Sequence, residues 1–462
     1  MGANPAGLVN RPSVSERRRF RVRGVVQGVG FRPFVYGLAV RHGLAGFVLN
    51  DGEGVVAEAE GPPAALDAFA AALAAEAPPL ARVESVTAEP LPLVGEAGFE
   101  IAASLGAGGA VAIPPDVATC ADCLRELFDP RDRRFRYPFL NCTQCGPRFT
   151  IVRSVPYDRS STTMAGFAMC AECRAEYEDP GDRRFHAEPT ACPACGPQLS
   201  MPLEAAVGLL RDGAIVAVKG LGGYHLACDA ADEAAVARLR TRKHRDEKPF
   251  ALLTAAPEAL CHVSAAEDAL LRSPARPIVL LRRRAGAAVA EGVAPGSPWL
   301  GAMLPYTPLH HLLAADFDGP LVLTSGNVSD EPIAFADAEA RRRLGSIADA
   351  FLAHDRPIHR RCEDSVVRAG TPVRRSRGYA PAGLPLPDCG RTIVAAGAEL
   401  KSTFCVGRRG EAFLSPHLGD LESEAAYRAF RADLELYLAM LDVELDVVAH
   451  DLHPEYLSTK WA

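Results

Sequence analysis

The sequence lacks the segments that direct a chain to a membrane. Its first residues, MGANPAGLVNRPSVSERRRF, contain no apolar core that could act as a signal peptide, and position 6 is alanine where an N-terminal acylation motif needs Ser or Thr. No apolar run approaches the length of a membrane-spanning helix. These features, together with cysteines whose spacing does not suggest disulfides, predict a cytoplasmic protein with no membrane partner.

An excess of basic charge is also missing. The chain of 462 residues has 50 Lys and Arg against 57 Asp and Glu, a net charge of −7. The overall charge therefore gives no reason to expect nucleic acid as a partner, and a partner with a basic surface is favoured. With 48% hydrophobic and 23% charged residues the composition is that of a globular protein, and the length suggests about three domains.

Two common nucleotide-binding signatures are absent as well. The pattern G-x-x-x-x-G-K-[ST] does not occur, because GAELKST near Gly397 lacks the second glycine, and no G-x-G-x-x-G follows a strand. A Walker site and a dinucleotide-binding fold are therefore disfavoured. Any polyphosphate must be held by other groups.

Cysteine, in contrast, is present in a regular arrangement. Eight of the 13 cysteines form two units with the spacing C-x2-C-x18-C-x2-C: Cys120, Cys123, Cys142 and Cys145, then Cys170, Cys173, Cys192 and Cys195. The two segments also share a DPxDRRF core and a CGP ending, fifty residues apart. A repeat this close indicates one supersecondary unit used twice.

The spacing of each unit suits a tetrahedral zinc ion. Two C-x-x-C turns supply four thiolates and leave no open position, so we expect two structural Zn2+ sites rather than catalytic ones. Each site would contribute roughly 10–16 kcal/mol of metal-linked folding free energy. The alternatives are disulfides or an iron–sulfur cluster. The remaining cysteines are expected to be buried, inert thiols: Cys228, Cys261, Cys362, Cys389 and Cys405.

The N-terminal hundred residues show a β-α-β-β-α-β pattern. RRFRVRGVV alternates like a strand, QGVGFRPFVYGLAVRHGL reads as a glycine-bearing loop that opens a helix, and a hairpin around Asp51–Gly54, a helix over Pro63–Ala75 and a strand near Val83–Glu89 follow. This order predicts a ferredoxin-like fold. The loop can present backbone N–H groups to an anion ahead of a helix N-terminus, although a plain strand-to-helix turn would look the same.

The motif VRGVVQGVGFRPFVY resembles the acylphosphatase signature, and the resemblance covers about residues 18–103. It implies that Arg32 and the loop amides hold a phosphate while Asn50 orients the attacking water. Such hydrolysis needs charge stabilisation and a positioned water rather than a covalent nucleophile. The implied phosphate loop consists of Gln27, Gly28, Val29, Gly30 and Phe31.

From Pro202 the pattern changes to α/β. A helix over 203–212, a strand over 214–220, a helix over 233–242 and a strand FALLTA are expected, with short polar motifs at the element ends. Basic side chains interleaved with Thr, Ser and Asn suit a polyphosphate held without a Walker loop. The charge run from Arg242 to Lys248 could equally be a solvated helix end. The candidate nucleotide-binding residues are Lys219, Arg242, Lys243, Arg245, Lys248, Thr324, Ser325, Asn327, Arg374 and Arg377.

Four motifs in order, KGLGGYHL, RKxRxxKPFAL, TSGN and RRSRGYAP, resemble the YrdC-type carbamoyl-adenylate synthases over about residues 200–385. The resemblance implies ATP, with Mg2+, in a concave sheet where a carbamate-type group attacks the α-phosphate and releases pyrophosphate. Lys219, Arg245 and Lys248 are placed on phosphates, and Ser325 and Asn327 near the nucleotide or acyl group. The adjacent His310 and His311 are expected to be helix-end or pocket-wall residues, since neighbours on a helix point about 100° apart.

From Arg391 two or three strands, an amphipathic helix and a further strand are expected. GAELKSTF, SPHLGDL and DLHPEYLST resemble the opening of the actin-like, kinase-type domain of the HypF hydrogenase-maturation proteins. The chain stops within what should be a larger domain, so we expect a fragment or truncated form, with a short homologue as the alternative.

The order of these parts resembles that of the HypF carbamoyltransferases. An α+β multidomain chain is therefore expected: an acylphosphatase-like domain, tandem zinc-finger units, a YrdC-like domain and the incomplete start of an actin-like domain, over 18–103, 104–199, 200–388 and 389–462. The resemblance implies hydrolysis of carbamoyl phosphate, passage of the carbamate through an internal channel, and its adenylation with ATP. Transfer to a C-terminal cysteine of a HypE-like partner, on the way to the hydrogenase cyanide ligands, would follow in the longer protein. A threonylcarbamoyl-adenylate synthase acting in tRNA modification and a non-catalytic zinc-organised scaffold are the alternatives.

Overall fold

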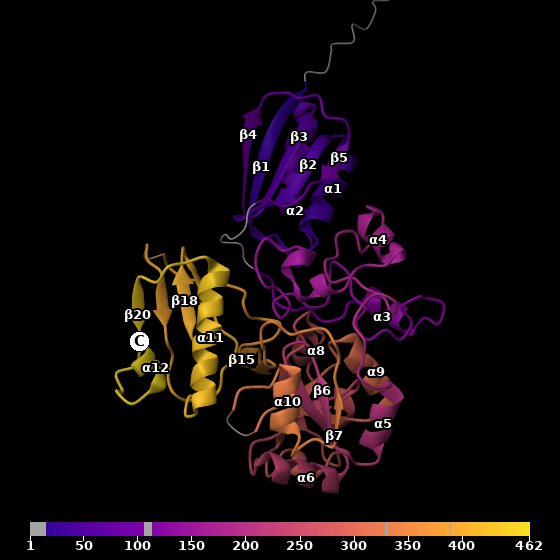
Figure 1. The fold of residues 1–462 in the computed structure, drawn as a ribbon, viewed down its shortest axis with the longest axis vertical. Helices are drawn as coiled ribbons and strands as arrows, with labels where there is room; N and C mark the ends of the chain where they lie inside the picture. The colour runs from indigo at the N-terminus through magenta and orange to yellow at the C-terminus, as the bar shows by residue number, and fades with distance from the viewer. Residues whose placement is uncertain (1–14, 106–112, 329–330, 389) are drawn as a thin grey trace, which may run out of the picture. The chain divides into compact units, whose positions relative to one another are not determined.

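The structure is a computed structural model that describes residues 15–105, 113–328, 331–388 and 390–462. The chain forms two compact units, residues 1–106 and 107–462, each of which is considered by itself (Figure 1). The thiol Cys389, expected to be buried, lies outside the described residues.

The first unit is an α/β sandwich built on one sheet. Its strands run in the order β4-β1-β3-β2-β5, with β5 parallel to β2 and the other pairs antiparallel. The helices contact each other and lie on the same face of the sheet. This confirms the ferredoxin-like fold, with β5 added at one edge. The elements are β1 (Glu16–Val25), α1 (Phe31–Arg41), β2 (Ala45–Asn50), β3 (Val55–Gly61), α2 (Pro63–Ala75), β4 (Arg82–Leu91) and β5 (Phe99–Ile101).

Alternation along β1 explains why this face is buried. Phe20 and Val22 point to the core and are almost fully buried, and the ring of Phe20 meets the ring of Phe69 from α2 edge-on, with centroids 5.2 Å apart. A strand whose apolar residues recur every second position presents them all to one side of the sheet. The loop from Val26 to Gly30, which carries the expected anion site, is thereby held between a buried strand and a buried helix.

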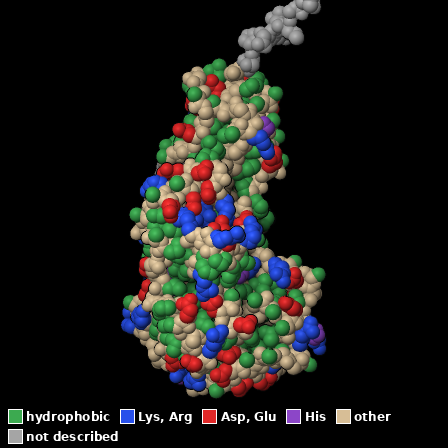
Figure 2. All heavy atoms as spheres, turned by 90° about the vertical axis from the view of Figure 1, so that its right-hand side faces the viewer, with side chains coloured by type: hydrophobic (Ala, Val, Ile, Leu, Met, Phe, Trp, Pro, Cys, Tyr) green, Lys and Arg blue, Asp and Glu red, His purple; other side chains and the backbone are tan. Residues whose placement is uncertain are grey.

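The second unit begins with the two cysteine-rich segments. Each contains one short helix that starts directly after the first cysteine of its unit: α3 (Ala121–Phe128) follows Cys120, and α4 (Ala171–Glu178) follows Cys170. The 3-10 helices η1 (Arg159–Ser161) and η2 (Thr163–Gly166) connect the two segments. Figure 2 looks onto the side of the second unit that carries α3 and α4, where Lys or Arg side chains, in blue, lie next to Asp or Glu side chains, in red.

A mixed ten-stranded sheet forms the centre of the second unit. Its order is β13-β6-β7-β12-β8-β11-β10-β14-β15, and β9 pairs with β10 off this path. The strands are β6 (Val216–Lys219), β7 (Tyr224–Asp229), β8 (Ala251–Leu253), β9 (Cys261–His262), β10 (Ile278–Arg283), β11 (Trp299–Met303), β12 (Leu321–Ser325), β13 (Ala350–Leu352), β14 (Val366–Arg368) and β15 (Thr371–Arg374). The helices are α5 (Leu203–Arg211), α6 (Glu233–Lys243), α7 (Pro257–Leu260), α8 (Ala265–Arg272), α9 (Pro308–Phe317) and α10 (Asp337–Leu344), with the 3-10 helix η3 (Glu291–Val293).

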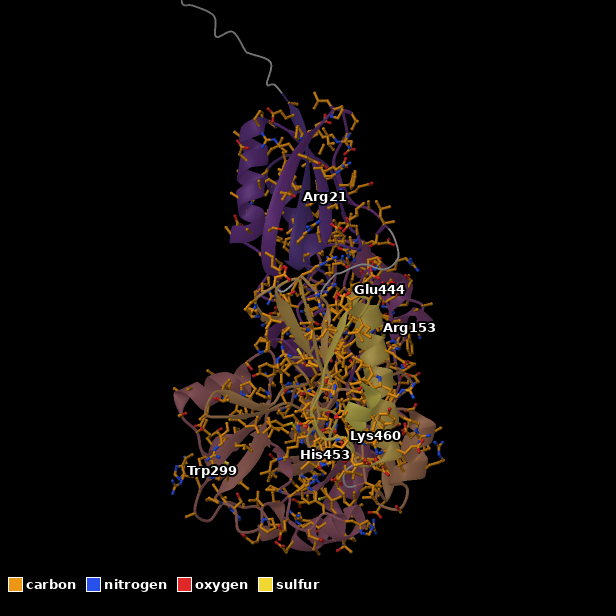
Figure 3. All side chains as sticks on the ribbon, turned by 90° about the vertical axis from the view of Figure 1, so that its left-hand side faces the viewer. Arg21, Arg153, Trp299, Glu444, His453 and Lys460 are labelled. Carbon is orange, nitrogen blue, oxygen red and sulfur yellow. The ribbon has the colours of Figure 1, made fainter. Side chains whose placement is uncertain are left out.

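A smaller five-stranded sheet, β16-β19-β18-β17-β20, ends the described chain and packs against α11 (Glu424–Leu441). Its core is continuous with the cysteine-rich region, since the ring of Phe149 lies edge-on to that of Tyr437, with centroids 6.0 Å apart. The last helix, α12 (Leu457–Trp461), closes this end, where Figure 3 labels His453 and Lys460. The strands are β16 (Leu384–Pro385), β17 (Ile393–Ala395), β18 (Cys405–Arg408), β19 (Glu411–Leu414) and β20 (Val447–Ala449).

The fold class expected from the sequence is confirmed, including the α/β pattern after Pro202. The first expected strand there is shorter than 214–220 and covers Val216–Lys219, because the chain turns at Gly220 to form the β6–β7 hairpin. Among the described helices, none combines the length and the apolar character that crossing a membrane would require.

Candidate functional site

The glycine loop between β1 and α1 has the backbone conformation of an anion-binding turn. Gly28 and Gly30 have φ angles of 69° and 75°, in the left-handed region that residues with a Cβ rarely adopt. Gly30 is the N-cap of α1, and no side chain caps this helix end. The partial positive charge of a helix N-terminus favours an anion there. The loop therefore fits a phosphate group without a side chain in the way.

Hydrogen bonds tie this loop to the end of β2, where Asn50 lies. The Gln27 side chain donates from Nε2 to the carbonyl oxygens of Asp51 at 2.8 Å and Gly54 at 2.7 Å. Asn50 itself is 1% exposed, and its Oδ1 atom has no hydrogen-bond partner among the described residues. A buried amide oxygen without a donor is costly unless water or a ligand completes it. The structure thus places Asn50 beside the loop with an acceptor still available.

Arg32, in the first turn of α1, is 7% exposed. Its Nη1 atom donates to the Ser104 hydroxyl at 3.3 Å. This hydrogen bond helps to orient the guanidinium group of Arg32. Ser104 was not predicted, because it follows β5 more than seventy residues after Arg32 and belongs to no motif.

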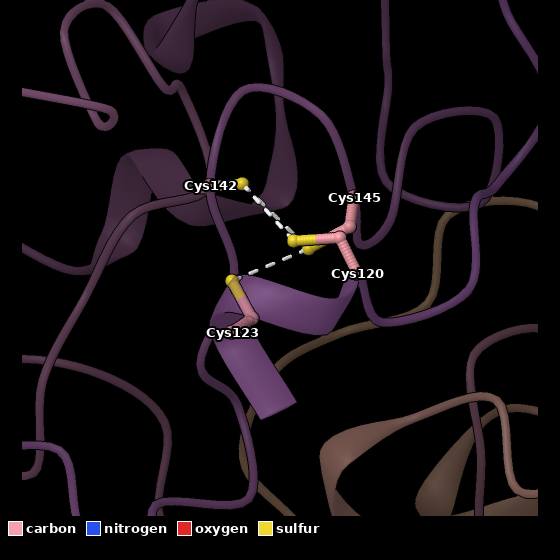
Figure 4. A group of neighbouring side chains, drawn as sticks. All are labelled: Cys120, Cys123, Cys142 and Cys145. Atoms are coloured by element: carbon pink, nitrogen blue, oxygen red, sulfur yellow. Dashed lines mark hydrogen bonds between the residues drawn. The ribbon is translucent and has the colours of Figure 1, made fainter. Parts of the chain in front are cut away.

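The first four-cysteine cluster closes around one point (Figure 4). Its sulfur atoms are separated by 3.7 Å for Cys120 and Cys142, 3.9 Å for Cys142 and Cys145, and 3.5 Å for Cys145 and Cys123. A tetrahedron with metal–sulfur bonds of about 2.3 Å places its sulfur atoms roughly 3.8 Å apart. The donor set and its geometry therefore suit zinc.

The second cluster repeats this geometry. The sulfur atoms of Cys170 and Cys192, Cys192 and Cys195, and Cys195 and Cys173 are 3.8, 3.8 and 3.6 Å apart. These separations are far longer than a disulfide bond of about 2.05 Å, and all eight residues are free thiols. Within the described residues these clusters are also the only groups of three or more Cys, His, Asp or Glu that could hold a metal ion. Both suit zinc, in agreement with the expectation.

A cavity of about 420 Å³ lies over the central sheet. Six of the ten candidate nucleotide-binding residues line it, and they come from the segment after α6, from the end of β12 and from β15. Three of the six are basic, and three carry hydroxyl or amide groups. They are Arg245, Lys248, Thr324, Ser325, Asn327 and Arg374.

The other four candidates do not line this cavity, and each of them contacts other protein groups. The Lys219 ammonium pairs with Asp337 at 2.7 Å, and Arg242 pairs with Asp349 at 2.7 Å. Burial lowers the pKa of Lys219. The Lys219 side chain therefore lies in the protein interior, and its expected contact with a phosphate stays a prediction.

Lys243 and Arg377 are likewise committed to the interior. Lys243 is fully buried and donates to the Ser325 carbonyl at 2.8 Å, so this hydrogen bond stabilises the end of β12. Arg377 donates from Nε to Asp364 Oδ1 at 2.6 Å, and its guanidinium lies 3.4 Å from the centre of the Tyr306 ring. Both residues act on the cavity indirectly, because their hydrogen-bond partners Ser325 and Asp364 line it.

His225, which belongs to the KGLGGYHL motif, and Asp364 form a buried pair in the wall, and this pairing was not predicted from the sequence. His225 Nε2 lies 3.0 Å from Asp364 Oδ2, and both residues line the cavity. Burial would raise the pKa of Asp364, but the charge of Arg377 and the hydrogen bond from His225 outweigh it and hold that pKa well below its usual range. The pairing joins β7 to a segment 139 residues later, so no local pattern could reveal it.

The C-terminal segment also contributes to this cavity. Lys401, His417 and Asp420 line it together with the central sheet. Burial lowers the pKa of His417 to about 4, so the imidazole is neutral at pH 7. These residues lie beyond the part of the sequence where the nucleotide site was expected.

The adjacent histidines His310 and His311 lie near the N-terminal end of α9, as expected for helix-end residues. His310 is fully buried with its ring centroid 4.4 Å from that of Tyr306, and burial lowers its pKa well below the usual range. Burial also lowers the pKa of His311 to about 3. Neither histidine belongs to a metal-binding group among the described residues.

Four family models match the chain in succession. An acylphosphatase model matches residues 18–101, and a model described as HypF finger matches 119–152 and 169–201. A Sua5/YciO/YrdC model, described as telomere recombination, matches 208–377, and a model described as HypF Kae1-like domain matches 388–462.

Curated proteins match along almost the whole chain. Carbamoyltransferase HypF2 of Cupriavidus necator is 50% identical over 96% of this chain and 60% of its own length, and carbamoyltransferase HypF of Rhodobacter capsulatus is 51% identical over 96% and 61%. A crystal structure of a full-length HypF in the phosphate- and nucleotide-bound form superimposes with a TM-score of 0.94, at 43% identity, over 98% of this chain and 62% of that one. The chain thus spans about three fifths of the length of these relatives.

Proposed function

Because the chain belongs to the HypF carbamoyltransferase family, we propose that it performs the first two steps of a carbamoyl transfer. It hydrolyses carbamoyl phosphate and then joins the resulting carbamate to the adenylyl group of ATP. The observation that carries this proposal is the presence in one chain of a glycine anion loop, with a buried asparagine beside it, and a separate cavity with basic side chains in its lining. One site suits a single phosphate group, and the other is large enough for a nucleotide.

In the first step, the loop 27–31 and Arg32 hold the phosphate of carbamoyl phosphate. Asn50 Oδ1 accepts a hydrogen bond from water and directs the water oxygen toward phosphorus. A new P–O bond forms, the bond to the carbamoyl oxygen breaks, and carbamate leaves with that electron pair. Arg32 and the backbone amides stabilise the charge that grows on the phosphoryl oxygens, and such stabilisation accounts for most of the rate gain in this class of reaction.

In the second step, Arg245, Lys248 and Arg374 hold the phosphates of ATP in the cavity, while Ser325 and Asn327 contact the nucleotide or the carbamoyl group. A carbamate oxygen attacks the α-phosphorus, and pyrophosphate leaves. Bound Mg2+ would neutralise part of the phosphate charge. Asp364 holds His225 in a fixed orientation at the wall, so that the imidazole can contact the small acyl group without rotating.

The cysteine clusters are proposed to bind one structural zinc ion each. Four thiolates fill a tetrahedral shell and leave no position for substrate. The first segment is joined to the central sheet by backbone hydrogen bonds from Ala118 to the Pro274 carbonyl at 2.9 Å and from Thr119 to the Tyr306 carbonyl at 3.0 Å. By stabilising this segment, the metal sites would also stabilise the part of the second unit that contains the nucleotide cavity.

Delivery of the carbamoyl group to a C-terminal cysteine of a HypE-like partner is proposed for the longer protein in the cytoplasm. The proposed domains are 18–103, 104–199, 200–388 and 389–462. The chain of 462 residues is expected to form the adenylate without completing transfer. Mass spectrometry of a HypE-like partner incubated with this chain and substrates tests that expectation, and a carbamoylated cysteine would contradict it.

The deciding experiment is ATP–pyrophosphate exchange with different acyl donors. We expect exchange that depends on carbamoyl phosphate and zinc-loaded protein. Stimulation by threonine with bicarbonate, and none by carbamoyl phosphate, would instead identify a threonylcarbamoyl-adenylate synthase. No exchange with any donor, together with unchanged phosphate release in Arg32→Ala, would identify a non-catalytic scaffold.

A further inference from the structure

The two cysteine units exchange arginines. Arg183, in the second repeat, donates from Nη2 to the sulfur of Cys123 in the first cluster at 3.0 Å. Arg133, in the first repeat, donates from Nη2 to the sulfur of Cys173 in the second cluster at 3.3 Å. Both arginines occupy the same position of the DPxDRRF core, fifty residues apart. Each cluster is therefore contacted by the guanidinium of the other repeat.

The same exchange holds for the carboxylates beside the clusters. Arg183 donates from Nε to Glu126 at 2.8 Å, and Arg133 donates from Nε to Glu176 at 3.0 Å. The two glutamates lie on α3 and α4, one helical turn after Cys123 and Cys173. Burial raises the pKa of Glu176, but the bonds from the arginines outweigh it and lower that pKa to about 2. Each helix that begins a metal site is thus held by an ion pair from the other repeat.

A second arginine in each core completes the symmetry. Arg134 donates from Nε to the Ala191 carbonyl at 2.9 Å, and Arg184 donates from Nε to the Asn141 carbonyl at 3.2 Å. These acceptors precede Cys192 and Cys142, the third cysteine of each cluster, and they also belong to the opposite repeat. The two arginine side chains are only 2% and 4% exposed. Contacts between the two repeats therefore recur at three pairs of equivalent positions, which indicates that they belong to the folded structure rather than to chance surface pairing.

Arginines closer in sequence do not provide these contacts. Arg125 on α3 and Arg174 on α4 pair with carboxylates of their own helix, Asp122 and Glu178, and are 73% and 57% exposed. A metal ion held by four thiolates carries net negative charge, which favours guanidinium donors to the sulfur atoms. The guanidinium groups that donate to Cys123 and Cys173 come from the opposite repeat.

We propose that the two metal sites form one interlocked unit, in which the DRR arginines of each repeat retain the metal of the other. The sites then cannot act as independent fingers. Substituting such an arginine in one repeat weakens metal binding at the cluster of the other repeat. Metal binding at the cluster of its own repeat is weakened less. This inference concerns the metal sites alone and does not depend on the proposed catalytic steps.

The test measures which cysteines are exposed when zinc is removed. The zinc-loaded chain and its Arg183→Ala and Arg133→Ala variants are treated with a chelator, labelled with a thiol reagent at intervals, and analysed by peptide mass spectrometry, with zinc counted by native mass spectrometry. In Arg183→Ala we expect the cysteines 120, 123, 142 and 145 to be labelled roughly 10–100-fold faster than in the parent protein. In Arg133→Ala the second cluster should show that increase instead.

Arg131→Ala is the matched control, because Arg131 lies in the same DPxDRRF core but is 89% exposed and pairs with Asp129 of its own repeat. Arg183→Lys and Arg133→Lys, which keep the charge but not the planar fork, cover the case in which an alanine variant fails to fold. These should show smaller crossed increases. Faster labelling in the repeat that carries the substitution, equal labelling of both clusters, or rates no higher than in Arg131→Ala would each overturn the proposal.

Discussion

The glycine loop of the first unit and the cavity of the second unit are both candidate phosphate sites, but they are assembled differently. The loop supplies consecutive backbone N–H groups from residues 27–31, with Arg32 next in the chain. The cavity takes its side chains from β7, β12, β15, the segment after α6 and the C-terminal segment. In the loop, sequence neighbours are also site neighbours. In the cavity, residues adjacent in sequence point to different places.

The run from Arg242 to Lys248 makes this difference concrete. Arg245 and Lys248 line the cavity, whereas Arg242 pairs with Asp349 and Lys243 is buried beneath Ser325. The four residues lie at the end of α6, where the chain turns at His244 with a positive φ of 52°. A turn of this kind redirects each successive side chain, so the charge of a motif does not tell which of its members meets the ligand.

The largest effect is expected in the loop. Arg32→Ala removes the side-chain cation that follows the proposed phosphate loop, and we expect release of phosphate from carbamoyl phosphate to fall by roughly 10²–10³-fold. Arg41→Ala is the control, because Arg41 lies on the same helix and pairs with Glu76 in an exposed ion pair. Phosphate release in both variants is measured by a colorimetric assay. A loss shared by Arg41→Ala would show that the effect comes from the fold of α1.

A smaller effect is expected in the cavity, where several cations share the phosphates. Arg245→Ala and Lys248→Ala should each lower carbamoyl phosphate-dependent ATP–pyrophosphate exchange by about 10–100-fold, the loss of one charge-assisted contact of about 1.5–3 kcal/mol. Release of phosphate should remain at the parent rate, because the two sites lie in separate units. An equal loss of exchange and of phosphate release would contradict the assignment of the two activities to separate sites.

Acid should act on the second unit through its partly buried histidines. Burial lowers the pKa of His359 and His417 to about 4, below the unfolded value of about 6.5. The unfolded state then binds more protons, so stability is complete above pH 6.5 and is lost as pH falls from 6.5 toward 4. We expect these two histidines to lower the free energy of unfolding by about 1–3 kcal/mol between pH 7.5 and about 5.5.

Calorimetry of the parent chain and of the His359→Gln/His417→Gln variant at several pH values measures this loss. The variant should lose about 1–3 kcal/mol less than the parent chain over the same range, because glutamine does not titrate. His310 and His311, whose pKa values burial also lowers, still contribute to the loss in both proteins. An identical decrease in both proteins would assign the acid sensitivity to other groups.

The smallest effect is expected for Arg242→Ala. Its ion pair with Asp349 is about one third exposed on both sides, and such pairs contribute roughly 0.2–1 kcal/mol. Exchange activity should stay within about twofold of the parent protein, while thermal unfolding shifts slightly. A loss as large as that of Arg245→Ala would show that Arg242 reaches the nucleotide after all.

The sequence by itself determined the features that follow from local spacing of residue types along the chain. The strand alternation around Phe20, the helix over Pro63–Ala75 and the two C-x2-C-x18-C-x2-C units all follow from local spacing, because turns and side-chain periodicity act over a few residues. The order of the motifs was enough to indicate the family.

Only the tertiary structure decided how distant residues meet. It brought His225 to Asp364, sent Lys219 to Asp337 instead of the cavity, and placed Lys401 at the cavity wall. It also placed an arginine of each cysteine repeat against a cysteine of the other repeat, although the two repeats look independent in sequence. A long-range contact depends on packing of the whole chain, and nothing in the local pattern distinguishes a guanidinium that bonds its own repeat from one that bonds the other.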